Sequence, residues 1–308
     1  MCVAFAFLWR KHQLAGFHLT STTPAKQNHR GLTEWLLLLG VLSVVAGFIV
    51  YAKLHDYRQI DTQERERLAS HTAVIEKNLT PQLRLANQVI ENIIHDIPSW
   101  MQQNDGLKGA NRELQVINDT LLGIRPILVI AADGNVIASS NAKLVGQNFT
   151  HREYFQTALK NPDPKVLHVS APFQTVLNTF VISLFCTIKG PDGEFAGIVI
   201  VSVVPEYFFT LLDAVRHAPD VKTALLHGDG KLFLMAPERP DLAGKDMATP
   251  DTLFTRHLQT GRVDNVFTAP VTLIGANRMV AFRTVNPADL HMDKPLVVTA
   301  SRDINEVF

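Results

Sequence analysis

The strongest hydrophobic pattern in the chain is an uncharged run from Trp35 to Ala52, WLLLLGVLSVVAGFIVYA. As an α-helix these eighteen residues would span roughly 27 Å, which is enough to cross the apolar core of a bilayer once. Trp35 and Tyr51 lie at its ends, where aromatic rings favour the headgroup layer, and Arg30 and Lys53 lie just outside. The pattern predicts a membrane anchor; a buried core helix and a cleaved signal peptide are the alternatives.

The charges beside this run do not decide which way it crosses the membrane. Lys26 and Arg30 precede the run, and it is followed by Lys53, Arg58, Arg65 and Arg67. The positive-inside rule alone would place the following region in the cytoplasm, but a large domain is translocated largely regardless of nearby charge. Residues 1–32 show no sustained apolar periodicity and are predicted to form a poorly ordered tail.

A long helix is predicted to follow the anchor, from Asp56 to about Trp100. Its apolar residues recur with helical spacing, as the sequence shows at Val89, Ile90, Ile93, Ile94 and Ile97. Pro81 should bend this helix or begin a new one. A helix that enters a folded domain directly from a membrane could couple the two mechanically, and a plain packing role is the alternative.

From Pro126 the pattern changes to short apolar strands separated by turn residues. Asp133-Gly134-Asn135 separates the strands 127–132 and 136–139, which predicts a hairpin. A helix should follow, because Thr150 and Glu153 have the spacing of a capping box. Further strands are predicted at 166–170, 179–188 and 196–203, and a helix from Pro205.

This order of elements then partly repeats. Strands at 224–226 and 232–235 flank Gly228-Asp229-Gly230, and Gly244 is comparable to Gly146. The Asp-Gly of the turn is twelve residues from that glycine in the first copy and fourteen in the second. A second helix is predicted from Thr249-Pro250, with strands near 263–268, 279–284 and 296–300. The pattern indicates two similar α/β modules, with a boundary near 214–220.

Composition and motifs narrow the function classes. The formal net charge is +0 and the pI about 7.2, so nucleic acid is not an expected partner. Cys2 and Cys186 provide neither a disulfide framework nor a metal site, and no metal or cofactor is predicted. The sequence contains no nucleophile elbow and no HExxH motif, and Gly228–Lys231 lacks the other residues of a phosphate-binding loop. A catalytic domain is therefore not expected.

Four segments resemble the double Cache sensor domains of bacterial transmembrane receptors: ADGNVIASSNAKLVGQNFTHREYFQTAL, HVSAPF, GPDGEFAGIVIVSVVPEYF and SRDINEVF. The resemblance covers about Asp56 to Phe308, and it is closest to the sensors of diguanylate cyclases and histidine kinases. It implies an α/β (α+β) fold in which a long N-terminal helix carries two tandem PAS-like modules with antiparallel sheets. It also implies that this region lies outside the cytoplasmic membrane, as the input part of a signalling protein.

The organisation implied by the resemblance has three parts: a cytoplasmic tail (1–32), a transmembrane helix (33–53) and a sensor region (54–308). The sensor region would comprise the long helix (54–103), a membrane-distal module (104–215), a membrane-proximal module (216–302) and the start of an exit helix (303–308). Any cyclase or kinase output domain would lie beyond residue 308. A homodimer is expected, because one helix per chain signals most easily when two helices can move relative to each other.

Arg152 is the most distinctive candidate for binding a ligand. A guanidinium makes two parallel, charge-assisted hydrogen bonds to a carboxylate. An exposed helix arginine, or one neutralised by Asp133, is the alternative. In amino-acid-binding members of the family, two aromatic residues and an alanine follow this arginine at the spacing of Tyr154, Phe155 and Ala158. The resemblance therefore implies that Arg152, Tyr154 and Phe155 line a pocket in the distal module.

Three further residues complete the candidate ligand-binding set: His168, Phe173 and Ser202. The chain departs from the amino-acid-binding pattern at Gln147 and Phe173, where tyrosines are expected, and at Ser202, where an aspartate would hold the ligand's ammonium group. A small carboxylate without that amine is therefore the favoured ligand. The function predicted is small-molecule sensing for a membrane signal-transduction protein; a membrane-tethered binding or scaffold protein without signalling is the alternative, and an extracytoplasmic enzyme is less favoured still.

Overall fold

The computed structural model describes residues 29–102, 106–121, 123–271 and 276–308, which form two compact units that divide at Asp56 and Tyr57. In the first unit, the described residues belong to helix α1 (His29–Gln102), and all residues from 34 to 50 are exposed. An 18-residue window here has a mean hydropathy of 2.4 and no buried residue. By length and composition this part of α1 can cross a membrane. Residues 1–28 of the predicted tail lie outside the residues that the structure describes.

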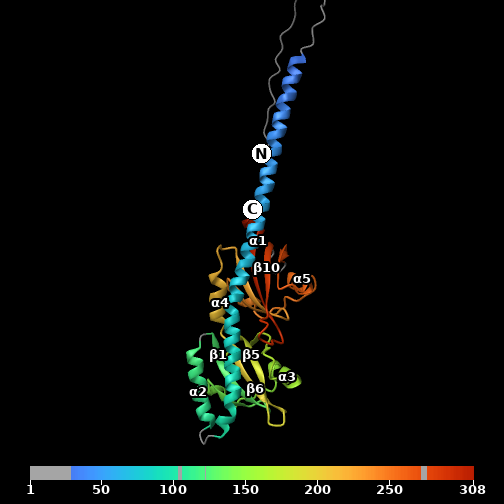
Figure 1. Ribbon diagram of the computed structural model, residues 1–308. Helices are drawn as coiled ribbons and strands as arrows, with labels where there is room; N and C mark the ends of the chain where they lie inside the picture. The colour runs from blue at the N-terminus through green and yellow to red at the C-terminus, as the bar shows by residue number, and fades with distance from the viewer. Residues whose placement is uncertain (1–28, 103–105, 122, 272–275) are drawn as a thin grey trace, which may run out of the picture. The chain divides into compact units, whose positions relative to one another are not determined.

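In the second unit, α1 runs alongside both sheets (Figure 1). Its apolar stripe is buried, with Leu79, Leu83, Ile90 and Ile93 at most 1% exposed. Pro81 lies within α1 and does not begin a new helix, contrary to one of the two expected outcomes. Pro81 has no backbone N–H, so α1 lacks one backbone hydrogen bond at this position. The helix tolerates this loss because its apolar stripe packs into the same core on both sides of the proline.

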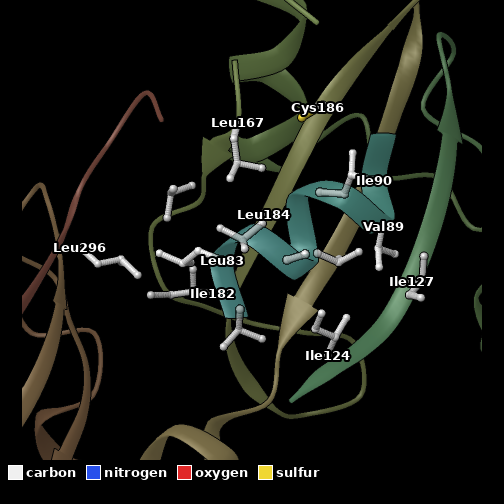
Figure 2. Packing of buried hydrophobic residues seen from close by; sticks show 14 of the residues in the cluster. Leu83, Val89, Ile90, Ile124, Ile127, Leu167, Ile182, Leu184, Cys186 and Leu296 are labelled. Carbon is white, nitrogen blue, oxygen red and sulfur yellow. The ribbon is translucent and has the colours of Figure 1, made fainter. Parts of the chain in front are cut away.

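The distal module contains an antiparallel sheet with the strand order β2-β1-β6-β5-β3, and β4 also pairs with β5. Helix α1 and helix α3 (Glu153–Lys160) cover its opposite faces, and α2 (Gly106–Thr120) packs against β1 and β2. Figure 2 shows Leu83 and Ile90 of α1 among side chains of the sheet. The strands are β1 (Ile124–Ala131), β2 (Val136–Ser139), β3 (His168–Val169), β4 (Phe173–Gln174), β5 (Phe180–Lys189) and β6 (Phe195–Val203), with a 3-10 turn η1 (Ala142–Leu144).

Helix α4 (Pro205–Ala214) leads to the proximal module, whose antiparallel sheet has the order β8-β7-β11-β10-β9. Helix α5 (Leu253–Thr260) contacts this sheet, as α3 contacts the distal one. The strands are β7 (Lys222–His227), β8 (Leu232–Ala236), β9 (Asp264–Val271), β10 (Ala276–Val285) and β11 (Leu296–Asp303), with a 3-10 turn η2 (Pro240–Leu242). Where the exit helix was expected to start, β11 passes directly into a 3-10 turn, η3 (Ile304–Glu306).

The predicted repeat is present in the backbone hydrogen bonds. Gly134 and Gly230 have φ values of +80° and +88°, a region that favours glycine. In the distal module, the Gly134 carbonyl accepts a hydrogen bond of 2.8 Å from the Phe149 amide. In the proximal module, the Gly230 carbonyl accepts one of 2.8 Å from the Met247 amide. The two modules therefore share one local design, and the fold class predicted from the sequence, an α+β fold with two antiparallel modules on a long helix, is confirmed.

The register of the sheets makes individual positions comparable between modules. Thr187 of β5 pairs with Ile198 of β6, and Thr284 of β10 pairs with Val297 of β11. Ile198 pairs on its other side with the β1 residue that follows the register shift in that strand. Val297 likewise pairs with the β7 residue that follows the register shift in β7. Thr187 and Thr284 therefore occupy equivalent positions.

An ion-pair cluster joins α1 to the C-terminal strand. Glu64 of α1 is buried, and its Oε2 lies 2.8 Å from Nη1 of Arg302 in β11. Asp220 accepts hydrogen bonds of 3.2 Å from the Arg302 side chain and from the Asp303 amide. Any displacement of α1 against β11 must break or rearrange these contacts.

Candidate functional site

Helix α3 and its N-cap residue position three of the predicted site residues, Arg152, Tyr154 and Phe155, but the helix begins later than the sequence indicated. Arg152 is the N-cap residue, in extended conformation, and makes no side-chain cap hydrogen bond. The capping-box prediction was wrong, because the Thr150 hydroxyl donates instead to Asn148 Oδ1 at 2.6 Å. Arg152 therefore lies immediately before the first turn of α3 rather than inside it.

The guanidinium of Arg152 has few partners. Nη1 donates to the backbone carbonyl of Gln174 at 3.2 Å, and the group lies 5.6 Å from the centroid of the Phe173 ring and 5.9 Å from that of Phe149. Asp133, the expected alternative partner, accepts hydrogen bonds from Asn135. No described carboxylate lies within ion-pair distance of Arg152, so most of its N–H donors are open to a ligand.

A small cavity of about 30 Å³ lies in the distal module beside Arg152, Tyr154 and Phe173. Ser202 and Ser183 also line it, and their hydroxyls are 2.9 Å apart. The turn at residues 175–177 covers it. Its volume suits a few water molecules, so a larger ligand would require this turn to move.

Tyr154 is a neutral hydrogen-bond donor at this cavity. It is 6% exposed, and burial raises the pKa of its hydroxyl well above the usual range. Its ring packs against Phe173 and Phe185, with centroids 5.4 and 6.2 Å away. A donor that stays protonated complements an anionic ligand held by a neighbouring guanidinium.

The six predicted site residues separate into three groups. Arg152, Tyr154, Phe173 and Ser202 all line the distal cavity. Phe155 is 1% exposed and packs edge-to-face against Phe195 in the core, so the structure does not bring it to the cavity. His168 is also buried, and it lies at the boundary with the proximal module.

Between the modules lies a larger cavity, the inter-module cleft, with a volume of about 310 Å³. On the distal side it is lined by Arg152, by residues of α3, and by Ser170 and Phe185. On the proximal side it is lined by His227, Asp229, Asp293 and Lys294. No local sequence pattern predicted these proximal residues as part of the site, because only the fold brings them to the same cavity as Arg152.

The proximal wall of the cleft is fixed by hydrogen bonds across the module boundary. Asp293 accepts from the Val169 amide at 2.8 Å, and its other oxygen lies 2.8 Å from His168 Nδ1. His227 Nε2 donates to the Val169 carbonyl at 3.1 Å, and its Nδ1 accepts from the Asp229 amide. Burial lowers the pKa of His227, which keeps it neutral at pH 7.

No protein-family model and no curated protein sequence matches the chain. Solved structures do match. The extracellular domain of the candidate histidine kinase rpHK1S-Z16 is 23% identical with a TM-score of 0.68, covering 80% of this chain and 97% of that one. The periplasmic sensory domain of the Campylobacter jejuni chemoreceptor Tlp1 is 12% identical with a TM-score of 0.64, covering 81% and 98%. The ligand-binding domain of the Pseudomonas fluorescens chemoreceptor CtaA, in complex with L-isoleucine, is 18% identical with a TM-score of 0.61, covering 82% and 98%.

These likenesses agree with the fold that the sequence predicted. The described residues after Asp56 have the double Cache fold, which is seen in extracellular and periplasmic sensory domains. At such identities the comparison establishes the fold, and function has to be argued from the site.

Proposed function

We propose that this chain is the extracytoplasmic small-molecule sensing part of a membrane signal-transduction protein of the histidine kinase or diguanylate cyclase type. The observation that carries this proposal is the Arg152 guanidinium, which lies at a cavity of the distal module without a carboxylate partner among the described residues. The double Cache fold and the apolar first part of α1 support it.

The ligand contains a carboxylate or a similar planar anion. Arg152 supplies paired N–H donors for it, and the neutral hydroxyl of Tyr154 adds a third donor. The Ser202 and Ser183 hydroxyls provide further polar contacts. Because the distal cavity is only about 30 Å³, a ligand group that enters this cavity requires movement of the turn at residues 175–177.

The signal travels through α1. This helix shares one apolar core with residues of both modules, and Arg302 ties it to β11. A ligand that binds one arrangement of α1 more tightly than another shifts the population between them. A membrane-tethered binding protein would bind the same ligand without this shift.

The chain is anchored in the cytoplasmic membrane by one crossing, with residues 54–308 outside the cytoplasm, and it works as a homodimer. An Asp192→Cys substitution places a thiol in the exposed turn between β5 and β6. In a Cys2→Ser background, with Cys186 buried, a membrane-impermeant maleimide should label this thiol in intact spheroplasts. Labelling only after lysis would place the sensor region in the cytoplasm.

A thermal-shift screen of small organic acids tests the binding proposal. At a concentration 100 times Kd, a ligand stabilises the folded state by about 2.7 kcal/mol, so at least one acid should raise the melting temperature. Arg152→Ala should abolish this shift and change the ligand-free melting temperature little. The matched control is Arg256→Ala: Arg256 of α5 lies over the Phe267 ring at 5.0 Å in the proximal module. An Arg152→Ala protein that melts several degrees earlier and still binds would make Arg152 structural.

A further inference from the structure

The inter-module cleft has room for an organic molecule without any change in structure. Its volume is about 310 Å³, against about 30 Å³ for the distal cavity, and small-molecule sites begin near roughly 300 Å³. Arg152, Tyr154 and Phe173 line both cavities. A ligand held by Arg152 can therefore extend toward the proximal module.

The distal end of the cleft is suited to an anion. Arg152 contributes its open N–H donors, and residues 151–154, which include the first residues of α3, line the cleft. The N-cap residue makes no side-chain cap hydrogen bond, so the backbone amides of the first turn of α3 lack that partner. Guanidinium and helix N-terminus favour the same charge at this end.

The opposite end is suited to a cation. Asp293 and Asp229 line it, and each carboxylate is already oriented: Asp293 by the contacts with Val169 and His168, Asp229 by Lys294 Nζ at 2.7 Å. Together with Glu153 the cleft has three carboxylates, but only two side chains of fixed positive charge, Arg152 and Lys294. An anion alone would add to this excess of negative charge, whereas a ligand that also contains a cationic group would leave the total unchanged and place its positive charge beside the carboxylates.

A buried imidazole beside this wall has an open acceptor. His168 Nδ1 faces the Asp293 carboxylate and so carries the proton, which leaves Nε2 as an acceptor. Nε2 is buried and has no hydrogen-bond partner in the described part of the chain. The ring stacks on Phe185, a residue that lines the cleft, with centroids 4.9 Å apart. His168 itself is not among the residues that line the cleft, and its ring supports the wall through its contacts with Phe185 and Asp293.

We propose that the ligand held by Arg152 is a small zwitterion that lies in the inter-module cleft and joins the two modules. Its carboxylate binds Arg152 and the start of α3, and its ammonium group binds Asp293 and Asp229. This inference rests on the proposed function. The carboxylate that the sequence lacks at Ser202 is supplied by the other module.

The test uses the full chain in detergent micelles and isothermal titration calorimetry with matched pairs of probes. 4-Aminobutyrate is compared with butyrate, and 5-aminopentanoate with pentanoate. The amine-bearing member of at least one pair should bind at least tenfold more tightly. Asp229→Asn and Asp293→Asn should each weaken that binding about tenfold, and Asp229→Asn keeps the test valid if Asp293→Asn fails to fold. Asp246→Asn, in a comparable exposed ion pair with Lys231, should leave it unchanged.

Two results overturn the inference. One is that no amine-bearing probe binds more tightly than its partner. The other is that the zwitterion binds the Asp229→Asn protein as it binds the wild type while Arg152→Ala abolishes binding. In both cases the proposed function stands, since it fails only if the organic-acid screen gives no ligand that depends on Arg152.

Discussion

The distal and proximal modules have the same backbone design but differ in what fills the space between helix and sheet. In the proximal module, His257 of α5 is fully buried and stacks on Phe282, with ring centroids 5.2 Å apart. Its Nε2 donates to Thr284 Oγ1 at 2.9 Å, and its Nδ1 accepts from Asn265 Nδ2 at 2.8 Å. The polar groups of this interior satisfy one another.

In the distal module the equivalent position is unsatisfied. Thr187 corresponds to Thr284, and its Oγ1 is buried without a hydrogen-bond partner. Helix α3 contributes no histidine here, and the ring that stacks on Phe185 belongs to His168 of β3. Thus the imidazole and the hydroxyl of the proximal interior are hydrogen-bonded, whereas the distal interior keeps an unpaired hydroxyl and the distal module has a small cavity beside Arg152.

The largest expected effect concerns the core that both modules share. Ile90 of α1 is fully buried between helix and sheet, so Ile90→Ala should lower the free energy of unfolding by about 3–4 kcal/mol. Val74 of the same helix is 43% exposed, and Val74→Ala should change it by less than about 0.5 kcal/mol. Urea denaturation followed by circular dichroism measures both. Equal effects would contradict the packing of α1.

A smaller effect is expected at the ion-pair cluster of the proximal module. Glu64→Gln removes the buried carboxylate that pairs with Arg302, a partly buried guanidinium whose remaining ion-pair partner among the described residues is Asp220, which should cost about 2 kcal/mol in the same denaturation measurement. Asp241→Asn removes a fully exposed pair with Arg239 and should leave the denaturation midpoint where it is. A midpoint unaffected by Glu64→Gln would show that the cluster does not tie α1 to β11.

Matched threonine substitutions sharpen the comparison of the modules. Thr284→Val removes the partner of a buried imidazole and should cost about 1–2 kcal/mol. Thr187→Val replaces an unsatisfied hydroxyl with a methyl group, and should leave stability unchanged or raise it. Thermal melts of the two variants provide the comparison. A reversed order would contradict the assignment of the distal interior as the unsatisfied one.

Acidification should destabilise the fold through its buried histidines. Burial lowers the pKa of His257 below 6.5, while Asp264 partly offsets this, and burial also lowers the pKa of His71 and His227. The unfolded chain then binds more protons than the folded one as the pH falls through 6.5 toward these lowered values, so stability is lost in that window. The melting temperature of the wild type should fall between pH 7.5 and 5.5. The melting temperature of the His257→Gln variant should fall less steeply over the same range.

The sequence predicted most of the fold because local signals agree with it. The strand expected at 179–188 is found at Phe180–Lys189, since apolar residues and flanking turns mark both of its ends. Helix α2 was missed although Ala110, Leu114 and Ile117 recur with helical spacing and pack into the shared core. Gly106 and Gly109 in its first turn lower the helix propensity of the segment, and packing against β1 and β2 compensates for this.

The candidate site could be predicted only in part, for a related reason. Arg152 and Tyr154 belong to one short segment whose spacing resembles a known pattern, and they do line the distal cavity. Asp293 lies 141 positions after Arg152 in the sequence. It is held at the cleft by its contacts with Val169 and His168. No local pattern contains such a contact.

The central claim, that the ligand is held at Arg152 and the start of α3 rather than at the equivalent helix of the proximal module, is tested most directly by hydrogen–deuterium exchange. The full chain is compared with and without the best compound from the organic-acid screen. Exchange should slow at residues 151–155 and 174–178 of the distal module, and stay unchanged at residues 252–258, which contain most of the equivalent helix α5. Protection at 252–258 without protection at 151–155 would contradict the claim and place binding in the proximal module.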